Sequence, residues 1–138
     1  MRAKVCDRLD DLESLIDNLR KASDEIGAIT VFIGVIRGVS KGCKVKQLEY
    51  EAHETLAPET MQKIIEDLKS KYGIIDAFLE HRAGIVKVGE DVMYAAVASK
   101  HREEGFKALI ELVDRVKREA PIWKKELTEK GAYWVENI

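Results

Sequence analysis

The chain has 138 residues, the size of a single domain with a hydrophobic core of its own. Apolar residues make up 46% and charged residues 35%, with a formal net charge of −2, which excludes a generally basic nucleic-acid-binding surface and an acidic tail. Nothing resembles a signal peptide or a transmembrane run, and Cys6 and Cys43 form neither a metal-binding motif nor a disulfide framework. We therefore expect a cytoplasmic protein without a metal site.

The first third of the chain predicts a helix followed by a strand. Residues 9–22 carry apolar side chains at helical spacing and predict a packing helix. Residues 27–37 are apolar on both alternating faces, which predicts an inner strand covered on both sides. Gly34 within it suggests a bulge or a close backbone approach. Arg37 ends this strand beside a Gly-rich loop, where it either holds an anionic group or is an ordinary solvated arginine.

The rest of the chain alternates between strand and helix patterns. The patterns predict a strand at 44–52, a helix at 58–72, strands at 74–80 and 91–99, a helix at 103–120 and a last strand at 132–136. A short apolar piece at 85–88 lies between two turns. This order predicts an α+β domain in which helices pack on a mixed, mostly antiparallel sheet.

The helix predicted at 103–120 contains one unexpected residue. Its apolar stripe predicts the face that packs on the core, and consists of Phe106, Leu109, Ile110, Val113, Val116 and Ala120. Lys117 falls between Phe106 and Ile110, on this inside face. Its ammonium group either reaches water past the helix end, with the stem packed on the core, or points into a cleft where it binds an anion or takes part in chemistry.

Basic residues gather around this helix. They come from three separated segments without a matching acidic cluster, and are Arg37, His101, Arg102, Lys117 and Lys124. The free N–H groups and the dipole at the start of the helix add to the attraction for an anion. The pattern predicts a pocket for a compact anion, most simply a phosphate-bearing small molecule.

Other residues that often carry chemistry are given structural roles. The three histidines are scattered, which disfavours metal binding. His81 is expected to be hydrogen-bonded at a strand end, and Cys43 has no base beside it that would mark a nucleophile.

Six segments carry a family resemblance in their order and spacing. They are G-A-I-T-V-F-I-G-V-I-R (27–37), L-E-Y-E-A-H (48–53), H-R-A-G with G-E (81–84, 89–90), A-S-K-H-R-E-E-G-F (98–106), V-K-R-E-A-P-I-W-K-K-E (116–126) and G-A-Y-W-V (131–135). With these segments the chain resembles the large, catalytic subunit of molybdopterin synthase, the MoaE family. The resemblance covers nearly everything after residue 26 of a single domain, 1–138. It implies an α/β-hammerhead-like fold with a small extra β subdomain.

The resemblance implies sulfur transfer in molybdenum cofactor biosynthesis. In that family the large subunit binds cyclic pyranopterin monophosphate. A small ubiquitin-like partner inserts its C-terminal Gly-Gly tail, which carries a thiocarboxylate, into the pocket. Two sulfurs delivered in succession build the dithiolene of molybdopterin, without a further cofactor. The large subunit usually forms a homodimer with one small subunit at each far end, which makes a heterotetramer.

The resemblance also implies the residues of the site. The substrate-binding positions would be Val35, Ile36, Arg37, His101, Arg102, Lys117, Lys124, Lys125 and Glu126. Lys117 and Lys124 would be catalytic, because they would stabilise the negative charge that develops as sulfur attacks and the acyl link to the partner breaks. Which lysine acts as the acid stays open. The chain departs from many family members at His53 and Gly105, where they carry other residues. Family members also often have a basic residue after the position of Trp134, and residues 135–138 contain none.

Two other functions fit parts of the pattern. A regulatory domain that senses a small phosphorylated ligand would need the same pocket without turnover. An RNA-binding domain is disfavoured by the near-neutral charge and by an expected lack of exposed aromatic residues for stacking.

Overall fold

The computed structural model describes residues 2–135, within which three helices and nine strands follow one another. The elements are β1 Ala3–Cys6, α1 Leu12–Arg20, β2 Ala28–Val35, β3 Val39–Ser40, β4 Cys43–Ala52, α2 Leu56–Tyr72, β5 Asp76–Arg82, β6 Gly84–Lys87, β7 Asp91–Ser99, α3 Arg102–Glu119, β8 Ile122–Thr128 and β9 Gly131–Val135. The predicted α+β class is confirmed. The predicted end of the last strand, Glu136, lies outside the described residues.

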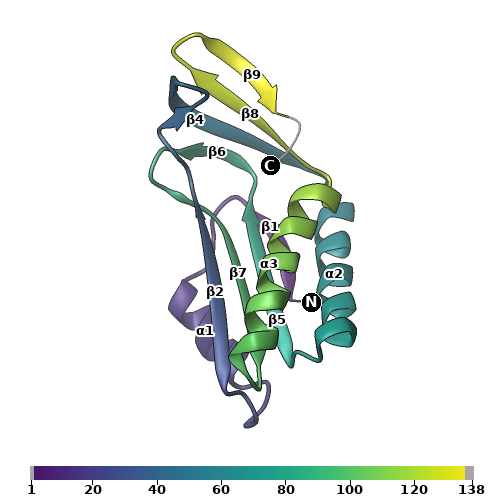
Figure 1. Ribbon diagram of the computed structural model, residues 1–138. Helices are drawn as coiled ribbons and strands as arrows, with labels where there is room; N and C mark the ends of the chain where they lie inside the picture. The colour runs from purple at the N-terminus through teal and green to yellow at the C-terminus, as the bar shows by residue number, and fades with distance from the viewer. Residues whose placement is uncertain (1, 136–138) are drawn as a thin grey trace.

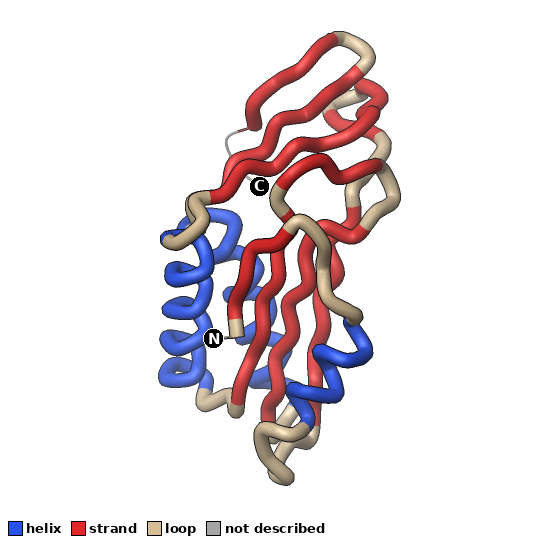
Figure 2. Tube along the Cα trace, turned by 180° about the vertical axis from the view of Figure 1, so that it is seen from behind, coloured by secondary structure: helices blue, strands red, loops and turns tan. Residues whose placement is uncertain are grey.

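Two sheets form the body of the molecule (Figure 1). The first has the strand order β1-β5-β7-β2, with β1 parallel to β5 and the other pairs antiparallel. Helices α2 and α3 cover one face of this sheet and α1 covers part of the other (Figure 2). The second sheet contains β3, β4, β6, β8 and β9, and stands at the end of the first sheet where α3 ends.

Strand β7 lies between two hydrophobic cores, because its successive side chains point to opposite faces of the sheet. Ala95 and Val97 face the core under α2 and α3, whereas Ala96 and Ala98 face the core under α1. All four are fully buried, and their small side chains let helices approach the sheet closely from both sides.

Strand β2 is an edge strand, so the prediction of an inner strand covered on both sides is wrong. Its upper part is uncovered, because α1 is short, and Ile33 and Val35 are 44% and 51% exposed. The register shifts between Gly34 and Val35, which confirms the bulge predicted at this glycine. Both faces of β2 are apolar because each is partly covered by a helix, although the strand lies at the edge of the sheet.

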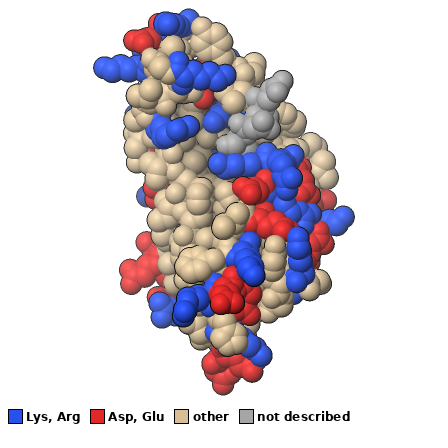
Figure 3. All heavy atoms as spheres, viewed as in Figure 1, with Lys and Arg blue, Asp and Glu red and all other residues tan. Residues whose placement is uncertain are grey.

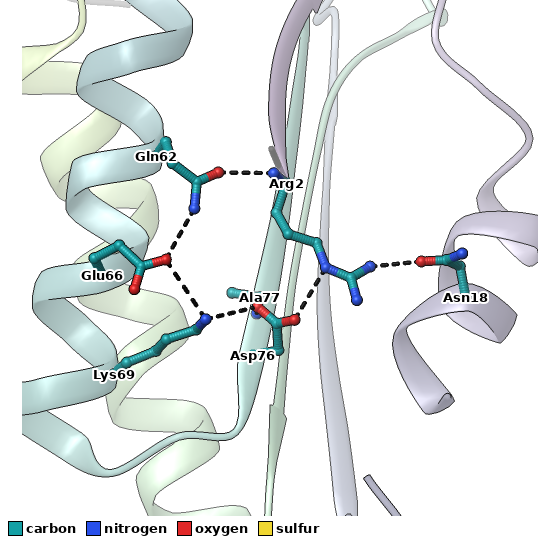
Figure 4. Close-up of polar contacts among 7 residues, drawn as sticks. All are labelled: Arg2, Asn18, Gln62, Glu66, Lys69, Asp76 and Ala77. Carbon is teal, nitrogen blue, oxygen red and sulfur yellow. Dashed lines mark hydrogen bonds and ion pairs between the residues drawn. The ribbon is translucent and has the colours of Figure 1, made fainter. Parts of the chain in front are cut away.

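Four strands were missing from the predicted order, namely β1, β3, β6 and β8. Strand β8, which follows Pro121, pairs with β4 and β9 and joins the second sheet. Strand β1 adds a parallel edge to the first sheet. Its position is held by Arg2, whose guanidinium binds Asp76 at 3.0 Å and Asn18 at 2.6 Å, while its backbone N–H donates to Gln62 (Figure 4). Lys69 also contacts Asp76, which ties β1, α1, α2 and β5 together.

Helix α3 buries a face that overlaps only part of the predicted stripe. Val116 and Ala120 of that stripe are buried, and Leu109 and Val113 pack partly buried against the core. The residues that it packs on the sheet are Gly105, Ala108, Leu112 and Val116. Phe106 and Ile110 are 56% and 65% exposed, and Lys117 is exposed as well. Lys117 does share a stripe with Phe106 and Ile110, as predicted, but that stripe faces away from the core. Figure 3 shows a largely uncharged surface on the side of α3 that adjoins β2.

Candidate active site

A cavity of about 320 Å³ opens where the two sheets meet, beside the last turn of α3. Arg37, Lys117, Lys124 and Glu126 are the charged residues among its lining. Lys and Arg side chains are visible around this junction in Figure 3. Three positive charges against one negative leave the cavity with a net positive charge, which favours an anionic group such as a phosphate. The pocket found within one chain is therefore suited to a compact phosphorylated ligand.

Strand pairing aims Lys124 and Glu126 into the cavity. Lys124 lies directly opposite Tyr50, and Glu126 lies opposite Leu48, in the antiparallel pair of β4 and β8. Residues that pair directly share a face of the sheet, and Tyr50 and Leu48 are buried on the cavity side. Lys125 therefore points to the opposite, outer face.

The outer face of the second sheet places Lys125 among exposed aromatic residues. Its ammonium lies 5.6 Å from the ring centroid of Trp134, which is 56% exposed. Trp123 is also half exposed, so the expected lack of exposed aromatic residues is wrong. In this chain Lys125 is not among the residues that line the cavity, although its neighbours Lys124 and Glu126 are.

The ammonium of Lys124 is held in a half-buried position. Its side chain is 17% exposed and its Nζ lies 3.9 Å from Glu126 Oε1. Burial lowers the pKa of Lys124; the Glu126 carboxylate opposes this shift, and the positive charges of Lys117 and Arg37 add to it. Arg37 and Lys117 therefore lie close enough to Lys124 to act on its charge. Ser40 donates a hydrogen bond to Glu126 and restricts the carboxylate.

The segment after β2 brings three predicted residues to the cavity rim. Val35, Ile36 and Arg37 all line the cavity. Ile36 anchors the segment, since it is 3% exposed and exchanges backbone hydrogen bonds with Gly89 and Glu90. The bulge at the end of β2 thus leads into a fixed turn that leaves the Arg37 side chain exposed at the rim.

His101 and Arg102 lie at the other end of α3 from this cavity. His101 is the N-cap residue, and its side chain is 80% exposed and lies 3.6 Å from Glu104. Both residues line a separate surface hollow, together with Lys71, Lys100 and Lys107. An 18-residue α-helix is about 27 Å long, so one chain does not bring His101 and Arg102 together with Lys117. The predicted gathering of all five cations within one chain is wrong.

The cavity is also lined by two aromatic residues that the sequence analysis did not place in the site. Tyr50 and His81 are 5% and 3% exposed and both line the cavity. Their rings meet edge to face, with centroids 5.0 Å apart. The expected strand-end hydrogen bond of His81 is present, because its Nδ1 lies 2.8 Å from the Arg82 carbonyl oxygen. The H-R-A-G segment of the sequence pointed to this position, but its cavity-facing side follows only from the fold.

Residues 7–119 match the model of the MoaE protein family. The chain belongs to this family. It is 38% identical over 115 residues to a molybdopterin synthase catalytic subunit of Pyrococcus abyssi, covering 83% of this chain and 78% of that protein. It is 37% identical over 123 residues to the Bacillus subtilis protein of the same name, covering 89% and 77%.

The fold is also that of solved MoaE-family structures. The crystal structure of molybdopterin synthase from Staphylococcus aureus contains a chain that superposes with a TM-score of 0.88 at 28% identity, covering 98% of this chain and 97% of that one. A complex of subunits 1 and 2 of molybdopterin-converting factor from Helicobacter pylori contains the same fold, with a TM-score of 0.77 at 20% identity. The hammerhead-like α+β architecture is thus that of the family.

Two further properties concern the part of the chain that the structure describes. Residues 2–135 contain no group of three metal-ligating side chains placed to hold a metal ion. None of the helices in this range combines the length and the apolar run needed to cross a membrane.

Proposed function

We propose that the chain is the catalytic subunit of a molybdopterin synthase, and that the cavity at the sheet junction binds cyclic pyranopterin monophosphate. Membership of the MoaE family, together with a pocket lined by three basic residues and one acidic residue, supports this function. The observation that carries the proposal is the convergence of Arg37, Lys117 and Lys124 on one cavity. The sulfur would arrive as the thiocarboxylate of a small ubiquitin-like subunit. Two free cysteines, Cys6 and Cys43, are compatible with a reducing, cytoplasmic location.

The three basic residues would have different roles, which depend on their positions in the cavity. Arg37, with its planar fork of donors, would bind the phosphate at the rim. Lys117 and Lys124 would face the acyl carbon of the partner's terminal glycine. The thiocarboxylate sulfur would first bond to a carbon of the pterin. Attack of water on the acyl carbon would then break the acyl–sulfur bond, leaving the sulfur on the pterin and a carboxylate on the partner. This attack places negative charge on the acyl oxygen, and two fixed ammonium groups would stabilise that charge. Lys124, whose pKa is lowered, is the better placed of the two to give up a proton to the leaving sulfur.

A second copy of the chain would complete the site with its own His101 and Arg102. The exposed side chains of Phe106 and Ile110 occupy the middle of α3. A twofold axis beside Ile110, perpendicular to the helix, would pack these side chains against their equivalents. It would also bring the start of α3 in one copy beside the end of α3 in the other. His101 and Arg102 of one copy would then stand next to Lys117 of its partner, and each homodimer would contain two composite sites.

Dithiolene formation is the test of this function. The wild-type chain, supplied with a thiocarboxylated small subunit and cyclic pyranopterin monophosphate, is expected to form molybdopterin. Lys117→Ala and Lys124→Ala should each lower the rate about 10²–10³-fold, the loss typical of removing one group that stabilises a developing charge. Lys63→Ala, an exposed lysine on α2 away from the cavity, is the matched control and should keep the wild-type rate. Binding of the pterin without any product would show a ligand sensor instead, and an undiminished rate in Lys117→Ala would refute the catalytic role of that residue.

A further inference from the structure

Two of the residues that line the cavity are polar, uncharged and deeply buried, with the Glu126 carboxylate near one of them. The rim carries Arg37, Lys117 and Lys124, whereas Tyr50 from β4 and His81 from β5 form the floor. Both are more than nine-tenths buried, and their rings lie against each other. A buried polar side chain normally has a hydrogen-bond partner, so the partners of these two residues need to be identified.

The proton of His81 is fixed on one ring nitrogen. Nδ1 lies 2.8 Å from the carbonyl oxygen of Arg82, and because a carbonyl oxygen only accepts, Nδ1 is the nitrogen that carries the hydrogen. Nε2 is then left with a lone pair and acts only as an acceptor. Burial, reinforced by the positive charge of Lys117, lowers the pKa of His81 to about 4, so the ring stays neutral near pH 7.

The remaining polar atoms of the pair open into the cavity. Among residues 2–135, neither His81 Nε2 nor the Tyr50 hydroxyl has a hydrogen-bond partner. Every side-chain nitrogen or oxygen in this range that is fully enclosed does have a partner, so these two atoms are not fully enclosed. Both atoms must therefore reach open space, and the cavity is the space that both residues line. Burial and the nearby Glu126 carboxylate raise the pKa of Tyr50 to about 12, which keeps its hydroxyl protonated.

We propose that Tyr50 and His81 form a neutral subsite that binds an uncharged N–H or O–H group of the phosphorylated pterin while the cationic rim holds its phosphate. The proposal rests on the function proposed above and assigns the floor a specificity role. Nε2 accepts a hydrogen bond from the ligand, and the Tyr50 hydroxyl donates one to a ring or carbonyl acceptor beside it. A ligand with phosphate but no such polar ring would satisfy the rim and leave both floor groups unpaired. This selects phosphorylated heterocycles over phosphate itself.

The subsite is tested by comparing two probes, cyclic pyranopterin monophosphate and inorganic phosphate, by titration calorimetry on the dimeric protein. Tyr50→Phe, which removes one oxygen atom, and His81→Leu are each expected to weaken pterin binding about tenfold and to leave phosphate binding unchanged. His81→Gln should restore much of the pterin affinity, because its amide oxygen can accept in place of Nε2. Arg37→Ala, by contrast, should weaken both probes.

The outcomes separate the subsite from the proposed function. Pterin affinity equal to the wild type in both Tyr50→Phe and His81→Leu overturns the subsite alone. Equal losses for the pterin and for phosphate in Tyr50→Phe also overturn it, since they would mark a general disturbance of the cavity. A wild-type protein that binds phosphate but not the pterin overturns the proposed function and the subsite together. A thermal melt of each variant shows whether it is folded, and Tyr50→Phe, which keeps its ring contact with His81, decides the question if His81→Leu does not fold.

Discussion

If the active site is shared between two copies of the chain, two inactive variants should restore each other. Lys117→Ala damages the cavity half of the site, and Arg102→Ala damages the half at the other end of α3. Each homodimer then has two defective sites. A mixed dimer has one doubly defective site and one site in which Lys117 and Arg102 are both intact. Mixed dimers purified through two different tags should therefore show about half of the wild-type rate.

The assay is dithiolene formation by the three dimer species under identical substrate conditions. The homodimers of the variants should fall about 10²–10³-fold below wild type, so recovery to about half is a large signal. The matched control is a mixed dimer of Lys117→Ala with Lys124→Ala. Both residues line the same cavity of the same copy, so neither of its sites is whole and no activity should return. A Lys117→Ala/Arg102→Ala mixed dimer as inactive as its parents would refute the shared site.

Dissociation of the dimer is the complementary perturbation. Phe106 and Ile110 are 56% and 65% exposed in one chain, and covering about half of each side chain is worth about 1 kcal/mol per residue. Ile110→Asp removes this contribution from both copies, about 2 kcal/mol, which raises the dimer dissociation constant at least about 30-fold. Sedimentation equilibrium measures it. Leu56→Asp, at an apolar residue of α2 that is 49% exposed, is the control and should leave dimerisation unchanged. Unchanged association of Ile110→Asp would place the interface elsewhere.

Two further predictions concern the pH dependence of the rate and the packing of α3. The lowered pKa of Lys124 means that its charge is lost at a lower pH than for an ordinary lysine, so kcat/KM should fall as pH rises through this range. Glu126→Gln removes the carboxylate that opposes the shift, and should move this alkaline limb to still lower pH; a limb that moves upward would contradict the assignment. A Cβ at Gly105 would lie 2.7 Å from the buried Ser99 Oγ, so Gly105→Ala should cost about 1–3 kcal/mol in urea unfolding. The double variant with Ser99→Ala should recover part of this loss, and an additive loss would contradict the steric explanation.

The fold class could be predicted from the sequence because most helices and strands are marked by local sequence patterns. Helical spacing, a Pro in the first turn of α2 and Gly73 in the left-handed conformation at its end are local signals, and they were sufficient. Strand β8 was missed because its alternation, from Ile122 to Thr128, contains two adjacent lysines and a glutamate and was interpreted through its charges instead. Recognising that alternation would also have separated Lys125 from Lys124, since adjacent strand residues face opposite sides.

The site was only half predictable for a different physical reason. Periodicity shows which residues share a face of a helix, but not whether the same chain covers that face. The stripe containing Phe106, Ile110 and Lys117 is real, and in this chain it is exposed. Sequence motifs also gave no distance between His101 and Lys117, although the length of the predicted helix alone places them far apart. His81 was expected only to be hydrogen-bonded at a strand end, and the fold shows that it lines a cavity together with Tyr50.

The two ends of α3 suit opposite halves of one anion site. Lys117 lies in the last turn, where the negative end of the helix dipole stabilises a cation, and Arg102 lies in the first turn among free N–H groups at the positive end. Antiparallel pairing of two such helices would place each positive end beside the partner's negative end, with the phosphate between them. Ser99 supports the N-terminal half, because its hydroxyl donates a 2.6 Å hydrogen bond to the His101 carbonyl. A Gly105→Ala chain, which displaces that hydroxyl, should therefore behave like Arg102→Ala in mixed dimers. It should restore activity when paired with Lys117→Ala and fail to do so when paired with Arg102→Ala.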